Sequence, residues 1–258
     1  MKKFMLSLVS ALFVIFALAG YSEAFWFLDY MTHDGCRIEK IEYKDTYDDT
    51  IRETMSFTYD AFGHVVEITI IWDNEKFVLY FTNDADGNPE KLEIDENDNG
   101  ETDFLAYYKY DEDGKIERLE FDENLDGSID FYADHIYDGE GKLVGIEGRN
   151  YESDELEEVE EFEYYPDGKL KKVITDWGAD GYIEEVEYWE YDDDGKLKKL
   201  EIDIDDDGTI NEVATPVWDC DPSFEDPDDD DSFEDPDDND DDDDSSSSSS
   251  GCFIGALK

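Results

Sequence analysis

The sequence has 258 residues, of which 39% are hydrophobic and 15% aromatic, enough to form the core of one or two domains. Its formal net charge is -56. So acidic a surface repels nucleic acid and anionic lipid and attracts cations, which excludes nucleic-acid binding. The charge favours a protein or cell-envelope partner that is basic rather than acidic.

The start of the chain, residues 1–24, has the pattern of a secretory signal peptide. A basic start is followed by an apolar run over residues 5–19 and by the small-x-small site Ser-Glu-Ala at 22–24. The alternative is a membrane anchor, for which the apolar run is short. We predict export, with a mature chain that starts at Phe25, has no transmembrane segment, and is extracellular, on the cell surface or periplasmic.

Glycines recur along the middle of the chain at a regular interval of about 27 residues, which indicates an array of repeats. A second glycine series has the same interval, with Asp154 at the position where one glycine is missing. The first series is Gly87, Gly114, Gly141, Gly168 and Gly195, and the second is Gly100, Gly127, Gly181 and Gly208.

One unit, residues 108–134, reads YKYDEDGKIERLEFDENLDGSIDFYAD. Two runs of aromatic and branched residues are each followed by an Asp- and Gly-rich turn, a pattern typical of a β-hairpin. We predict an all-β antiparallel meander of about seven 27-residue β-hairpin repeats over residues 29–215, forming a twisted or curled sheet. Leu197 and Leu200 differ in parity, which predicts a bulge or a strong twist after the Gly turn, or apolar groups on both faces.

The strand-and-turn motif resembles two known repeat families. The segments YKYDEDGKI, IYDGEGKL and WEYDDDGKL resemble the core of YD (RHS-type) repeats, and YYPDGKLKKV resembles MORN-variant repeats. The resemblance covers residues 29–215 and implies a β-hairpin array. In large toxins, YD arrays form β shells around a cargo.

The second corner of three units resembles the first nine positions of an EF-hand calcium loop, in which oxygen ligands surround a glycine. The match is incomplete, because Ala106, Ala133 and Ala214 stand where a bidentate Glu is needed at position 12, and only Glu187 in a weaker copy fits. The alternative is that Asp, Asn and Gly simply form turns. Calcium is the candidate cofactor, and the candidate metal ligands are Asp95, Asn97, Asn99, Asp103, Asp122, Asn124, Asp126, Asp130, Asp203, Asp205, Asp207 and Asn211.

No catalytic constellation is visible. The three histidines, His33, His64 and His135, are scattered, and no Ser/His/Asp or Cys/His arrangement follows from the sequence. We predict that the protein is not an enzyme and has no catalytic residues.

Cys36, Cys220 and Cys252 are too few and too widely spaced for a disulfide framework. In an open sheet, about fourteen strands at ~4.8 Å each separate Cys36 from Cys220, so we predict that the two are not bonded. Such a bond would require a closed barrel or shell instead.

The end of the chain has a different composition. Residues 216–250 are rich in Asp and Ser and are predicted to form a disordered linker. Residues 251–258 begin with Gly-Cys-Phe-Ile, which resembles the start of bacterial C-terminal tags and makes Cys252 a candidate for anchoring.

Two functions therefore remain. The first is an exported, non-enzymatic structural or interaction module at the cell surface or in the medium, stabilised by calcium. The second is a binder or buffer of divalent cations that uses the acidic loops and the tail.

Overall fold

The structure, a computed structural model, describes residues 32–33 and 36–220; the predictions for residues 1–24 and 221–258 fall outside this range. In the described range all regular elements are strands, and no helix there is long and apolar enough to cross a membrane. The strands are β1 (Thr32–His33), β2 (Cys36–Asp45), β3 (Ile51–Tyr59), β4 (Val65–Trp72), β5 (Glu75–Asn83), β6 (Pro89–Asp95), β7 (Phe104–Tyr110), β8 (Ile116–Asp122), β9 (Phe131–Tyr137), β10 (Leu143–Asn150), β11 (Leu156–Tyr164), β12 (Leu170–Trp177), β13 (Glu185–Tyr191), β14 (Leu197–Ile204) and β15 (Glu212–Asp219).

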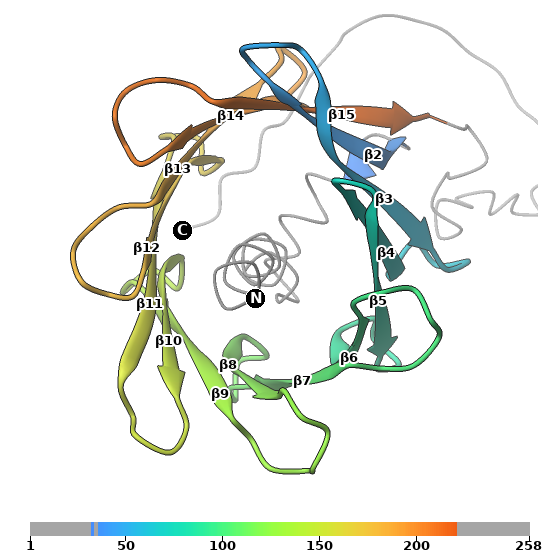
Figure 1. Cartoon of the computed structure of the whole chain (residues 1–258), viewed down its shortest axis with the longest axis vertical. Helices are drawn as coiled ribbons and strands as arrows, with labels where there is room; N and C mark the ends of the chain where they lie inside the picture. Colours follow the sequence, from blue (N-terminus) through green and yellow to red (C-terminus); the bar gives the residue numbers. More distant parts are fainter. Residues whose placement is uncertain (1–31, 34–35, 221–258) are drawn as a thin grey trace, which may run out of the picture. The chain divides into compact units, whose positions relative to one another are not determined.

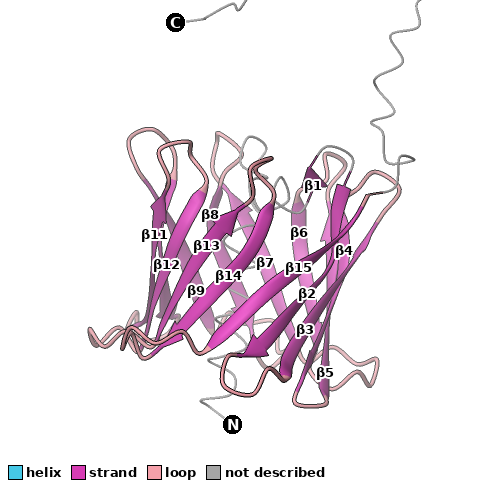
Figure 2. Cartoon of the chain, turned by 90° about the horizontal axis from the view of Figure 1, so that it is seen from above, coloured by secondary structure: helices cyan, strands magenta, loops and turns pink. Residues whose placement is uncertain are grey.

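Strands β2 to β15 follow one another in chain order, each antiparallel to its neighbours, and β2 pairs with both β3 and β15. These fourteen strands therefore close into a β-barrel, seen as a ring in Figure 1 and from the side in Figure 2. The all-β, antiparallel part of the prediction is confirmed, but the twisted or curled open sheet is wrong. Closure pairs the backbone groups that two edge strands would leave exposed.

The Asp-x-x-Gly segments form the tight turns of the hairpins. In one of them, the Asp111 carboxylate accepts hydrogen bonds of 2.9 Å from the backbone N–H groups of both Asp113 and Lys115. Gly114 completes the turn with a φ of 81°, a conformation that glycine adopts without steric cost.

A β-bulge follows each of these turns. Tyr191 pairs with Leu197 while Glu190 pairs with Lys199, which leaves Lys198 as the extra residue. The bulge brings Leu197 and Leu200 to the same face of the sheet, and both are buried. The bulge predicted from their parity is confirmed.

Neighbouring units are joined by a repeated contact at the bulge. The Tyr164 hydroxyl donates a 2.6 Å hydrogen bond to the carbonyl oxygen of Leu143, in the preceding unit. The Lys142 ammonium group lies 3.7 Å from the centroid of the Tyr164 ring, a cation–π contact. The same hydroxyl-to-carbonyl bond, over the same sequence separation, is made by Tyr59, Tyr110 and Tyr137.

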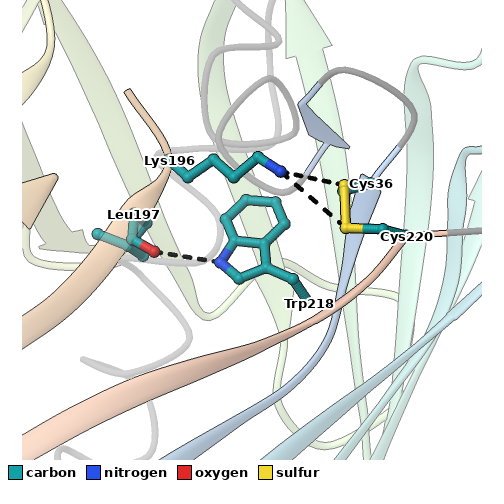
Figure 3. Close-up of a disulfide and its surroundings, with 5 residues drawn as sticks. All are labelled: Cys36, Lys196, Leu197, Trp218 and Cys220. Carbon is teal, nitrogen blue, oxygen red and sulfur yellow. Dashed lines mark hydrogen bonds between the residues drawn. A yellow bond between two sulfur atoms is a disulfide. The ribbon is translucent and has the colours of Figure 1, made fainter. Parts of the chain in front are cut away.

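The contact also occurs where the two ends of the described chain meet. Trp218 in β15 donates from its indole Nε1 to the Leu197 carbonyl oxygen at 3.2 Å, and the Lys196 ammonium group lies 5.7 Å from its ring (Figure 3). Trp218 pairs with Ile38 of β2 at a bulge, as Tyr191 pairs with Leu197 within a single unit. One hairpin of the barrel is therefore built from the last strand and β2.

In this split hairpin, a disulfide joins Cys36 to Cys220, so the prediction that they are not bonded is wrong. That prediction assumed an open sheet, whereas closure places the two cysteines at the same corner (Figure 3). Ile38 corresponds to Leu197 of an intact unit. Cys36 lies two residues before Ile38, just as the turn residue Gly195 lies two residues before Leu197. The disulfide therefore stands where each intact unit has its turn.

The two faces of the barrel differ in chemistry. Buried apolar side chains from β2 to β15 form one core cluster on the inner face. The outer face carries cross-strand ion pairs, such as Lys171 with Glu163 at 2.9 Å and Arg118 with Asp134 at 2.6 Å. Apolar side chains therefore predominate on the inner face, and charged side chains predominate on the outer face.

Candidate functional site

Six glutamates lie on the mainly apolar inner face, and we call them the inner glutamate cluster. Cross-strand pairing shows that they share this face: Glu160 pairs with Thr175, which pairs with Glu185. The cluster consists of Glu53 on β3, Glu158 and Glu160 on β11, Glu185 and Glu187 on β13, and Glu212 on β15.

The cluster occupies defined positions of the repeat. At one inward-facing position of the repeat, three successive units have an aromatic residue and the next four units around the ring have a glutamate. Its members are Phe77, Phe104, Phe131, Glu158, Glu185, Glu212 and Glu53, and from Phe77 to Glu212 they recur with the same period as the glycines. The ring is therefore divided into an aromatic half and an acidic half.

Several of these carboxyl groups are deeply buried. Glu160 is 0% exposed and Glu158 3% exposed. Within the described residues, neither oxygen of Glu160 has a hydrogen-bond partner, nor has Oε1 of Glu158. Glu187 differs, because it accepts a 3.0 Å hydrogen bond from Nε1 of Trp189. A buried carboxylate without a partner is costly, so these groups favour their protonated form.

The pKa values follow from this burial. Removal from water raises the pKa of Glu53, Glu158 and Glu185 to about 8 and that of Glu187 to about 7. Burial, together with repulsion from Glu158 and its neighbours on β13, raises the pKa of Glu160 as well. In the folded protein, part of the cluster is therefore protonated at neutral pH.

His135 on β9 continues the cluster along the inner face. It pairs with Ile146, which pairs with Glu160, so the two ionisable side chains are two strands apart on one face. His135 is 8% exposed, and neither ring nitrogen has a partner among the described side chains. Burial lowers the pKa of His135 to about 4, so the imidazole is neutral and one nitrogen can accept a hydrogen bond.

No strand of the described range places a Lys or Arg in these inner rows. Arg52 is a basic group that acts on the cluster, because it lowers the otherwise raised pKa of Glu212. Arg52 is held by Asp45 at 2.8 Å at the end of the strand. Among residues 32–33 and 36–220, no Lys or Arg of the inner rows therefore acts as a counter-ion to the cluster.

The Asp-rich corners use their polar side chains to fix the loops. Asp122 is 1% exposed and accepts from the backbone N–H groups of Asp126 and Gly127 at 3.1 and 2.9 Å. Asp130, at the other end of the loop, accepts at 2.9 Å from the N–H of Glu123. The loops at Asp95 and Asp203 repeat these bonds through Gly100, Asp103, Gly208 and Asn211.

The arrangement of the acidic side chains bears on the calcium site predicted at these corners. No group of three or more His, Cys, Asp or Glu side chains within the described ranges is arranged to hold a metal ion. Glu187, which alone matched the twelfth EF-hand position, lies in the inner glutamate cluster and bonds Trp189 instead. Calcium binding by the corners stays a prediction.

The sequence analysis missed the inner glutamate cluster, although a signal for it exists. In EEVEEFEY, Glu158 and Glu160 share the parity of Phe162, and in EEVEYWEY, Glu185 and Glu187 share the parity of Trp189. Comparing equivalent positions of successive units would have shown glutamate replacing phenylalanine or alanine on the buried face.

Comparison with known proteins shows no family. No family model matches the chain, and no curated protein does. A porin-like protein from Bacteroides uniformis shares 10% identity at a TM-score of 0.40, over 70% of this chain and 98% of its own. The Tc holotoxin pore of Photorhabdus luminescens shares 12% identity at a TM-score of 0.22, over 64% of this chain and 12% of the toxin chain. Scores this low carry no argument about function.

Proposed function

We propose that this chain is an exported, non-enzymatic repeat protein that works as a structural or interaction module. One observation carries the proposal: the Cys36–Cys220 disulfide stands where the other hairpins have a turn. Disulfides persist in oxidising compartments and are rare in the cytosol. A barrel with such a bond where β15 meets β2 therefore suits an extracellular, cell-surface or periplasmic protein.

The charged outer face supports the proposal that the module works in an aqueous compartment. One of the ion pairs on this face joins Lys171 to Glu163, whose side chains are 47% and 48% accessible. A net charge of -56 favours a basic partner through long-range attraction.

Export is tested by expressing the whole chain in a secreting host and measuring the mass of the product. We expect a mature protein that starts at Phe25 and has Cys36 and Cys220 oxidised. A secreted product that keeps residues 1–24 would contradict the signal peptide. One with both thiols free would contradict the role given to the disulfide.

The alternative function, a divalent-cation binder or buffer, is separated from this one by calorimetric titration with calcium. A structural module has few weak sites or none. Many equivalent sites would favour the buffer instead.

A further inference from the structure

We propose that the Cys36–Cys220 disulfide is a site of thiol exchange with a fixed direction, at which an incoming thiol becomes bonded to Cys220 and Cys36 leaves. The proposal goes beyond the structural role above, because it assigns a chemical reaction to the bond. It rests on the unequal surroundings of the two sulfur atoms and on Lys196, which contacts both of them (Figure 3).

The two cysteines differ in their access to solvent. Cys36 is 5% exposed at the start of β2, whereas Cys220 is exposed directly after the end of β15. Thiol–disulfide exchange begins when a thiolate attacks one of the two sulfur atoms, and access helps to decide which one is attacked. Cys220 is therefore the sulfur that an incoming thiolate reaches.

A positive charge lies beside the sulfur that must leave. The Lys196 Nζ atom is 3.1 Å from Sγ of Cys36 and 4.0 Å from Sγ of Cys220. Burial alone would disfavour a thiolate at Cys36, but an adjacent ammonium group stabilises one. Exchange is faster when the leaving thiolate is more stable, so Lys196 makes Cys36 the better leaving group.

The position of Lys196 follows from the repeat. Lys115, the equivalent lysine of another unit, donates from its Nζ to the Gly141 carbonyl oxygen at 2.9 Å, in the turn of the unit that follows. In the split hairpin, Cys36 stands where that turn glycine would be. The same lysine position therefore meets a sulfur atom instead of a turn.

The exchange balances with a thiol, R–SH, as the only co-reactant. R–SH loses its proton to solvent, and its thiolate attacks Sγ of Cys220 to form a new S–S bond. The bond to Cys36 breaks, and its electron pair stays on Cys36 as a thiolate that pairs with Lys196. Because β15 also pairs with β2 through backbone hydrogen bonds, the product is still a closed ring and carries R at the end of β15.

The direction of attack is tested on the unmodified exported protein with 2-mercaptoethanol as the probe. The exchange is stopped with acid at early times, and the modified cysteine is identified by peptide mass spectrometry. We expect at least about fivefold more mercaptoethanol on Cys220 than on Cys36. Equal labelling, or labelling mainly of Cys36, would overturn the proposal. A protein that lacks the bond before the probe is added would instead contradict the proposed function, so the two failures are distinguishable.

Lysine variants test the role of the positive charge. Lys196→Gln should slow the loss of the disulfide in 2-mercaptoethanol at least about threefold, whereas a merely structural loss would loosen the hairpin and speed it. Lys196→Arg keeps the charge and should stay within about twofold of the unmodified protein.

Lys142→Gln is the matched control, because it removes the equivalent lysine from the Tyr164 ring of another unit and should leave the rate unchanged. An unchanged or faster rate in Lys196→Gln, or an equally slow Lys142→Gln, would overturn the role of Lys196. If Lys196→Gln does not fold, the labelling ratio on the unmodified protein decides.

Discussion

The hydroxyl group of Tyr164 donates a hydrogen bond to the Leu143 carbonyl oxygen in the preceding unit, a contact that recurs in other units. Replacing Tyr164 with Phe leaves the Leu143 carbonyl without this donor and should cost about 1 kcal/mol. That corresponds to a fall of roughly 2–4 °C in melting temperature for a domain of this size. Tyr151→Phe is the matched control, because this ring is 53% exposed in a loop. Equal shifts in the two variants would contradict the role given to the bond.

The inner glutamates make stability depend on pH in a direction opposite to that of ordinary surface carboxylates. Their folded pKa values, about 7 to 8 for Glu53, Glu158, Glu185 and Glu187, lie above the unfolded value of 4.5. The stabilisation by the protonated form is complete below pH 4.5 and is lost as the pH rises towards 8. While they titrate, each proton bound only in the folded state changes the free energy of unfolding by about 1.4 kcal/mol per pH unit.

We therefore expect the free energy of unfolding in urea to fall between pH 5.5 and 7.5 at constant ionic strength. Glu160→Gln with Glu187→Gln should flatten this slope, because glutamine stays neutral, and Glu161→Gln should not. A stability that rises over this range would show that the glutamates are ionised and paired in the folded protein.

Single residues also show what the sequence could predict. The parity of Leu197 and Leu200 predicted the bulge, because an apolar side chain must reach the buried face. Glu160 was missed, because a glutamate in a strand is expected to face water when no other unit is compared with it.

At the scale of the elements, variants of the Asp-rich corners distinguish loops held only by hydrogen bonds from loops that also bind calcium. Asp122 holds the loop through backbone N–H groups, so Asp122→Ala should lower stability by about 1–2 kcal/mol in both calcium and chelator. If the corners also bind calcium, removing Asp126 and Asp207 together should lower the melting temperature in calcium and change it little in chelator. A hundredfold excess of calcium over its dissociation constant would stabilise each site by about 2.7 kcal/mol.

Thermal unfolding in millimolar calcium, chelator and ionic-strength-matched sodium checks both predictions. If calcium and sodium raise the melting temperature equally, the effect is charge screening and the corners are only turns. If Asp122→Ala is harmless in chelator, the loop does not depend on its hydrogen bonds.

The elements were the most predictable part of the fold. The evenly spaced glycines marked the hairpins, because turns of this kind need a left-handed residue, and Gly114 has a φ of 81°. Asp154, which replaces one such glycine, keeps the left-handed conformation with a φ of 57°. The EF-hand resemblance failed at position 12 for a physical reason: that residue already belongs to the next strand and faces inward.

At the scale of the whole barrel, the disulfide closes a loop with a sequence separation of 184 residues. Removing a crosslink of this length costs up to about 5 kcal/mol by loop entropy. We expect Cys36→Ser with Cys220→Ser to lower the free energy of unfolding towards that limit while the far-ultraviolet circular dichroism is kept. The ring remains closed because β15 and β2 pair from Glu212 with Asp45 to Asp219 with Arg37. An unchanged stability would contradict the role of the disulfide as the substitute turn.

Closure was not predictable from one unit, because the period of the repeat fixes the hairpin and not the number of hairpins in a full turn. The twist and stagger between neighbouring strands decide that number, and these belong to the assembled sheet. Cys36 and Cys220 occupy the two sides of the turn that the split hairpin lacks. This correspondence can be recognised only once β2 and β15 are known to pair.

The central claim, that the last strand and β2 form one hairpin closed by a disulfide, is tested most directly by a peptide map. The exported protein is alkylated without reduction and digested, and the fragments are identified by mass spectrometry. The account predicts a crosslinked fragment that joins Cys36 to Cys220 and disappears on reduction, with Cys252 outside the bridge. Alkylated Cys36 and Cys220, or a bridge from either to Cys252, would contradict it.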